Sequence, residues 1–131
     1  MTINITAVFA ATFVSYVLGS LWYLWLGKSW RHAVGWTEDG PPYRPTPFEL
    51  VVGLIGQFIM AIALSGILFQ MGMSGIGACL LGAFAIWLGF ILPSLATNVV
   101  FQRRNTSLIW QDGLHWLVIL ASQALVFGLM I

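Results

Sequence analysis

Two polar residues near the C-terminal end of the sequence have the chemistry of an acid–base pair. Asp112 and His115 stand three residues apart within Leu108–Ile131, a stretch that is otherwise mostly apolar. In a helix this spacing places both side chains on one face, where a carboxylate and an imidazole can hydrogen-bond directly. Such a pair suits a proton relay or a general base. The alternative is a structural lock, in which Asp112 bonds to His115, Asn98 or an arginine of the loop 102–107 and fixes the helix register.

Further polar residues are predicted to lie at the depth of this acid–base pair. Gln111 shares its helical face, and a rise of about 1.5 Å per residue brings Asn98, Gln57 and Tyr23 of the other apolar segments near that level. These four residues therefore join the pair as candidates for binding a ligand or a proton. Gln57 and Asn98 could equally serve as hydrogen-bonding partners between helices.

The composition indicates that these polar residues sit in a membrane. Of the 131 residues, 60% are hydrophobic and 7% are charged, whereas a soluble domain carries about 25% charged residues. A carboxylate or an imidazole is costly in hydrocarbon unless it faces a partner or a water-filled cavity. The remaining apolar segments must therefore shelter the acid–base pair.

The residue counts argue against several classes of site. The net charge is only +1, with no basic patch, so we expect no nucleic-acid partner. A single cysteine, Cys79, excludes an intrachain disulfide. Two histidines without a cysteine or carboxylate cluster make a poor metal site, and motifs of the Walker type are absent from the sequence. We therefore expect neither a metal nor a cofactor.

Four apolar segments reach the length of about 20 residues that a membrane-spanning helix needs. They cover residues 5–26, 48–69, 75–101 and 108–131. The predicted fold is an all-α membrane protein, an antiparallel bundle of four transmembrane helices that forms one domain over residues 1–131. The second and third segments are joined by a very short connection, which predicts a tight helical hairpin.

The first loop, residues 27–47, contains a second helical signal. Lys28–Trp36 predicts a short helix in the membrane interface, with Trp30 and Val34 toward lipid and Trp36 at the margin of that face. Pro47 suits the first turn of the next membrane helix, because its missing N–H is not needed there.

The cations predict the orientation of the chain. All five Lys and Arg residues lie in the loops 27–47 and 102–107. With four spans these two loops lie on the same side of the membrane, and the positive-inside rule makes that side cytoplasmic. Both termini are then expected outside.

Small residues recur every four positions in the first two segments, and one proline interrupts the third. Such stripes allow helices to approach closely in a membrane, so we expect a homo-oligomer embedded in the lipid bilayer. Pro93 removes one backbone hydrogen bond and predicts a kink or hinge. The stripes consist of Ala7, Ala11, Ser15 and Gly19, and of Gly53, Gln57, Ala61 and Ser65.

Several short motifs carry a family resemblance. They are GSLWY at 19–23, GKSW at 27–30, GFILP at 89–93 followed by Asn98 and Phe101, and DGLH at 112–115. Together they resemble the DUF1761 domain, an uncharacterised family of small bacterial four-span proteins, over nearly the whole chain. The resemblance implies four spans and the inner membrane of a bacterium, and it implies no activity.

These observations favour a binding or transport module. A polar cavity in the cytoplasmic half would take a small solute, a proton or an amphipathic ligand such as a lipid. One alternative is an integral membrane enzyme, in which Asp112 and His115 perform acid–base chemistry on a lipid-soluble substrate. Another is a non-catalytic subunit of a larger membrane complex.

Overall fold

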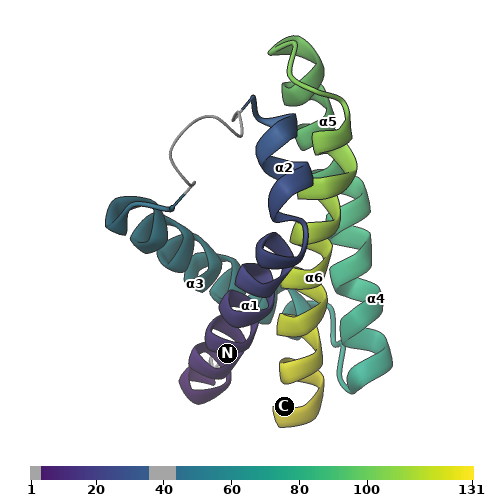
Figure 1. Ribbon diagram of the computed structural model, residues 1–131. Coiled ribbons are helices and arrows are strands. Elements are labelled where there is room, and N and C mark those ends of the chain that lie inside the picture. The colour runs from purple at the N-terminus through teal and green to yellow at the C-terminus, as the bar shows by residue number, and fades with distance from the viewer. Residues whose placement is uncertain (1–3, 36–43) are drawn as a thin grey trace.

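The computed structural model describes residues 4–35 and 44–131, and all regular structure in these ranges is helical (Figure 1). The helices are α1 (Ile5–Trp25), α2 (Gly27–Ala33), α3 (Pro47–Gln70), α4 (Ile76–Ile86), the π-helical turn η1 (Trp87–Ile91), α5 (Leu92–Phe101) and α6 (Ser107–Met130). Because α4, η1 and α5 continue one another, they form a single apolar helix, Ile76–Phe101. With α1, α3 and α6 it makes four helices long and apolar enough to cross a membrane. The predicted all-α fold with four such helices is confirmed.

Local sequence signals set where α3 begins and how it connects to α4. Thr46 caps α3 by accepting a hydrogen bond from the Glu49 N–H at 3.2 Å, and Glu49 Oε2 accepts one from the Thr46 N–H at 3.3 Å. This reciprocal capping box is completed by Pro47 in the first turn. The connection to α4 turns sharply at Gly72 and Gly75, whose φ angles of 66° and 84° favour glycine.

Helix α6 is the centre around which the others are arranged. Figure 1 shows α1 and the α4–α5 column on either side of α6, with the short α2 folded over one end of it. Helix α3 packs against α1 and α6 at one end and runs away from the α4–α5 column at the other. The first half of α3 is therefore largely exposed, with apolar side chains such as Phe48, Val51 and Ile55 on its surface.

The stripe of small residues on α1 forms its contact with α6. Ala7, Ala11, Ser15 and Gly19 are all buried. A Cβ atom on Gly19 would lie 2.7 Å from Ile119 Cδ1 and 2.9 Å from His115 Nε2. The absence of a side chain at Gly19 is therefore what allows His115 to lie directly against α1.

The apolar interior has one large and one small cluster. The large cluster joins α1, α3, α4 and α6 in the half of the molecule that contains the chain ends. The small one consists of Ala33, Val99 and Leu108, with Trp30 and Val34 packed against it. Prediction and structure differ here: α2 does not turn Trp30 and Val34 toward lipid, because both side chains pack against α5 and α6. Trp36 lies outside the described residues.

Pro93 is accommodated by a change of helical type. The N–H of Leu92 donates to the carbonyl of Trp87, five residues earlier, and Pro93 follows in the first turn of α5. This wider π turn makes room where a proline would otherwise clash with the preceding turn. It also brings Trp87 into the interior, where 8% of its surface is exposed.

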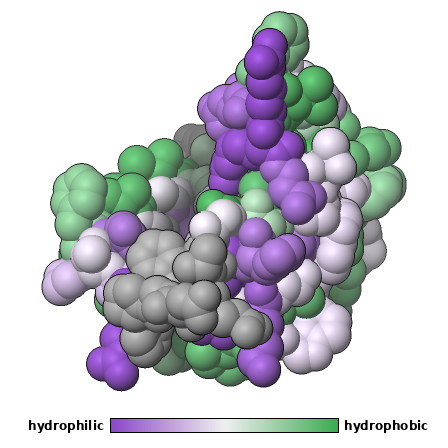
Figure 2. Space-filling model, turned by 45° about the horizontal axis from the view of Figure 1, so that its top comes forward, coloured by the Kyte–Doolittle hydropathy of each residue, from purple (hydrophilic) through white to green (hydrophobic). Residues whose placement is uncertain are grey.

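Charged residues gather at the end of the molecule where α2 and the α5–α6 connection lie. Lys28 and Arg31 are on α2, Arg103 and Arg104 lie between α5 and α6, and Arg44 precedes α3. Figure 2 shows hydrophilic surface concentrated at this end, with apolar surface on both sides. The polar end and apolar flanks match the distribution of a multi-pass membrane protein.

Candidate functional site

The carboxylate of Asp112 is held by two aromatic side chains from the other end of the sequence. The hydroxyl of Tyr23 donates to Asp112 Oδ1 at 2.6 Å, and the indole Nε1 of Trp30 donates to the same oxygen at 3.0 Å. Both donors come from elements other than α6, so these two hydrogen bonds tie α1 and α2 to α6 at this residue. The aspartate is half-buried where α1, α2 and α6 meet.

The corner between α1 and α2 brings these two donors together. Tyr23 lies near the end of α1, and Trp30 lies in α2 directly after the bend at Leu26. Their rings are 5.1 Å apart, measured between centroids. The neighbouring Trp22 also reaches α6, because its indole donates to the backbone carbonyl of Gln111 at 2.9 Å.

A third indole donates to α6 from its other side. Trp87 of the π turn donates from Nε1 to the carbonyl of Gly113 at 2.7 Å. Three tryptophans on three different elements therefore contact three successive residues, Gln111, Asp112 and Gly113. The first turns of α6 are thus fixed in rotation and depth, and the Asp112 carboxylate is fixed with them.

His115 lies one turn further along α6, beneath the carboxylate. Its ring is 4.5 Å from that of Tyr23 and 4.8 Å from that of Trp116, and only 5% of its surface is exposed. No side chain or backbone group in residues 4–35 and 44–131 hydrogen-bonds to its buried Nδ1. A buried polar atom without a partner is unusual and marks this position as one where another group could bind.

The direct hydrogen bond expected between Asp112 and His115 is not formed. Oδ1 of the carboxylate is taken by Tyr23 and Trp30. The imidazole instead packs against the ring of Tyr23, tilted by 37°, and against the ring of Trp116, edge-on at 73°. The alternative expectation, a lock between Asp112 and Asn98 or an arginine of the α5–α6 connection, is also wrong for the described residues, whose bonds to Asp112 come from Tyr23 and Trp30. Its second oxygen, Oδ2, accepts no hydrogen bond from them either.

The remaining predicted site residues divide among three places. Gln111 is buried beside Asp112 but directs its Nε2 to Ser107 Oγ at 3.1 Å, and its Oε1 has no partner among the described residues. Asn98 is exposed on α5, and its side chain contacts none of the groups around Asp112. Gln57 is buried in a separate polar cluster, so the six candidates do not line a single site.

That separate cluster joins α1, α3 and α6. The hydroxyl of Ser15 donates to Gln57 Oε1 at 2.8 Å. Nε2 of Gln123 donates to Ser15 Oγ at 3.2 Å and to the backbone carbonyl of Gln57 at 3.0 Å. Gln123 follows Asp112 by 11 residues, which corresponds to about 16 Å along α6.

The indole donors are the site residues that sequence reasoning missed. Trp30 lies 82 positions before Asp112, and Trp22 lies 89 positions before Gln111, so no local periodicity connects them. The signal that could have found them is a tryptophan in each of the motifs GSLWY and GKSW. In the described spans, Asp112 is the one carboxylate that lies away from a helix end, so it is the natural charged acceptor for their indoles. An indole N–H inside a membrane needs an acceptor.

The residues present limit the chemistry of the site. No group of three or more His, Cys, Asp or Glu residues within the described ranges could hold a metal ion. What the structure offers is one carboxylate with an open oxygen, one imidazole with an open nitrogen, and aromatic rings around both. Carboxylates and aromatic faces both attract cations, so the arrangement suits a proton or a small cation.

Comparison with known proteins agrees with the motifs. Nothing among the curated proteins or the solved structures matches this chain. One family model, described as a protein of unknown function (DUF1761), matches residues 6–128, which is nearly the whole chain. The protein therefore belongs to the DUF1761 family.

Proposed function

We propose that the protein is a small membrane transport module in which Asp112 binds a proton or a small cation that enters from the cytoplasmic side. The observation that supports this most directly is the state of the carboxylate. Tyr23 and Trp30 position Oδ1, while Oδ2 is left without a partner among the described residues. Oδ2 is not one of the fully buried atoms that lack a partner, so it is open to a proton or a cation that reaches the half-buried carboxylate.

The depth of the site also fits this role. Asp112 is five residues into α6, about 8 Å from its first residue. The end of α6 next to it carries α2 and the arginines of the α5–α6 connection. By the positive-inside rule this end faces the cytoplasm, so the proposed site opens toward the cytoplasm of a bacterial inner membrane and both termini face outside.

A route across the membrane has polar groups in two layers. His115 continues inward from Asp112, and the Ser15–Gln57–Gln123 cluster follows about 12 Å beyond His115. Between the two layers Ile119 is fully buried. The structure is therefore closed between them, and transport requires a movement that separates α1 from α6 at this level. We place this movement in a homo-oligomer, in which neighbouring copies shield the separating helix surfaces from lipid.

The test uses purified protein in liposomes that contain a pH-sensitive dye. A potassium gradient with valinomycin sets the membrane potential, and proton entry is recorded with and without external methylammonium. We expect flux above that of empty vesicles, and we expect Asp112→Asn to abolish it. The matched control is Glu49→Gln, since Glu49 is an exposed carboxylate whose capping role a glutamine can keep.

The outcomes separate a functional carboxylate from a structural one. Both variants are first compared with the wild type by size-exclusion chromatography, because a variant that falls apart reports stability rather than transport. Proton flux that methylammonium does not affect identifies the proton as the cargo, and flux carried by methylammonium identifies a small organic cation. Wild-type vesicles that carry neither, or a folded Asp112→Asn protein that transports normally, would refute the proposal.

A further inference from the structure

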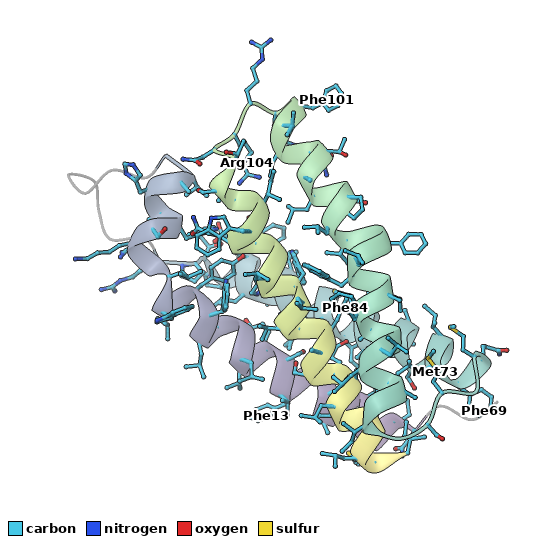
Figure 3. All side chains as sticks on the ribbon, turned by 90° about the vertical axis from the view of Figure 1, so that its right-hand side faces the viewer. Phe13, Phe69, Met73, Phe84, Phe101 and Arg104 are labelled. Carbon is cyan, nitrogen blue, oxygen red and sulfur yellow. The ribbon has the colours of Figure 1, made fainter. Side chains whose placement is uncertain are left out.

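A cavity lies at the opposite end of the bundle from Asp112. Its volume is about 380 Å³, and it is partly open. Its lining comes from the last turns of α3 and α6, the α3–α4 connection, the start of α4, and Asn4. Small-molecule sites have volumes of about 300–1,000 Å³. Phe127 of its lining follows Asp112 by 15 residues, about 22 Å along α6. In Figure 3, Met73 and Phe69 mark this end and Arg104 marks the other.

The walls of the cavity are mainly apolar and carry no charge. The polar side chains in its lining are those of Asn4, Ser65 and Ser74, and no acidic or basic side chain is among them. The apolar lining includes Leu68, Phe69, Met73, Phe127 and Ile131. A Cβ atom on Gly82 would lie 2.8 Å from both Leu68 Cδ2 and Met73 Sδ, so these two side chains are packed tightly against α4. Tight packing therefore holds these side chains of the wall in place, and the absence of charged side chains from the lining suits a neutral ligand.

One hydroxyl in the lining, that of Ser65, makes no hydrogen bond with the described residues. Ser65 is 6% exposed, and its Oγ has no partner in the part of the chain that the structure describes. The hydroxyls of Thr12 and Ser122, in other buried serine and threonine residues, each donate to a carbonyl of their own helix, and that of Ser15 donates to Gln57 Oε1. Ser65 could do the same and does not. Its oxygen is not one of the fully buried atoms that lack a partner, so the hydroxyl can be reached from the cavity and can bond to a group inside it.

We propose that this cavity binds a neutral, mainly apolar molecule that carries a single hydroxyl or carbonyl oxygen. The oxygen bonds to Ser65, and the hydrocarbon part lies along Leu68 and Phe127. Phe69 and Ile131 are largely exposed beside the cavity, so the ligand enters from the hydrocarbon of the membrane. The site is separate from the one at Asp112, and neither proposal depends on the other.

Photocrosslinking of the full chain in detergent micelles tests this. The probes are a diazirine derivative of 1-decanol and a diazirine derivative of decane, each competed by the unlabelled compound. We expect saturable labelling by the alcohol on peptides that contain Ser65 or Cys79, read by mass spectrometry. Ser65→Ala should raise the half-saturating concentration of the alcohol about fivefold, the effect of one lost hydrogen bond, and leave the decane probe unchanged.

Two further variants complete the test. Ser65→Leu places a side chain in the cavity and should abolish saturable labelling by both probes, while its circular dichroism spectrum and elution volume stay those of the wild type. Ser94→Ala removes a hydroxyl of α5 that bonds to its own helix and should change nothing. Labelling that cannot be competed, or that Ser65→Ala and Ser65→Leu both leave intact in folded protein, would overturn the assignment.

Discussion

Replacing Tyr23 with phenylalanine removes one hydroxyl and leaves the ring that packs against His115. The lost contact is the 2.6 Å hydrogen bond to Asp112 Oδ1. Hydrogen bonds to charged groups contribute about 1.5–3 kcal/mol, and neutral ones about 0.5–1.5 kcal/mol. Because Trp30 still donates to the same oxygen, the carboxylate is not left bare. We therefore expect Tyr23→Phe to lower the free energy of unfolding by about 1.5–2 kcal/mol.

A double-mutant cycle isolates the contribution of the charge. Asp112→Asn keeps the shape of the acceptor but turns the Tyr23 contact into a neutral hydrogen bond. The cost of Tyr23→Phe should then fall by about 1 kcal/mol, the difference between a charged and a neutral bond. Stability is measured by titrating detergent-solubilised protein with SDS and following helix content by circular dichroism.

Tyr16 provides the matched control for this cycle. Its hydroxyl donates to the backbone carbonyl of Leu50 at 3.1 Å, far along α1 from Asp112. Tyr16→Phe should therefore cost the same in the wild type and in Asp112→Asn. If Tyr23→Phe is equally additive with Asp112→Asn, the two side chains are not coupled. The derived geometry of the site would then be refuted.

Two further predictions concern the packing of α6. Gly19→Ala forces a methyl group against Ile119 and His115 of α6 and should destabilise the protein by about 1–3 kcal/mol in the same SDS titration. The control is Gly56→Ala, whose methyl group meets nothing within 4 Å. It should be neutral or slightly stabilising. Gln123→Leu removes the two hydrogen bonds that Nε2 donates to α1 and α3, and should lower the free energy of unfolding by about 1–3 kcal/mol. Ser122→Ala, whose hydroxyl bonds only within its own helix, should cost clearly less. Equal losses would contradict the role given to the Gln123 cluster.

The sequence was most informative where a property of the residues themselves decides the structure. A transmembrane helix satisfies its own backbone hydrogen bonds, so its existence depends on length and apolarity within one segment. Four such helices follow from composition alone, and the start of α3 follows from Thr46, Pro47 and Glu49 for the same reason. The small stripe on α1 also foretold a buried face, because spacing along one helix fixes which residues share a side.

The sequence was misleading where the answer depends on a second element. Equal depth in the membrane placed Asn98 and Gln57 beside Asp112, yet Asn98 is exposed and Gln57 bonds to Ser15. Depth specifies one coordinate, whereas rotation about each helix axis and the tilt of α3 determine which side chains meet. Trp30 was expected to face lipid because the apolar face of a short amphipathic helix can pack either on a membrane or on another part of the protein. Its own sequence does not distinguish between these two surfaces.

Composition and periodicity by themselves determined that this is an all-α chain with four membrane-length helices and an acid–base pair on one face of the last. Only the tertiary structure decided the partners of that pair. The carboxylate is held by Tyr23 and Trp30 and the imidazole packs against the Tyr23 ring, because the fold of α1 and α2 over α6 brings together groups more than 80 residues apart. The sequence of a helix shows which of its polar groups need a partner, whereas the packing of the helices determines which residues become those partners.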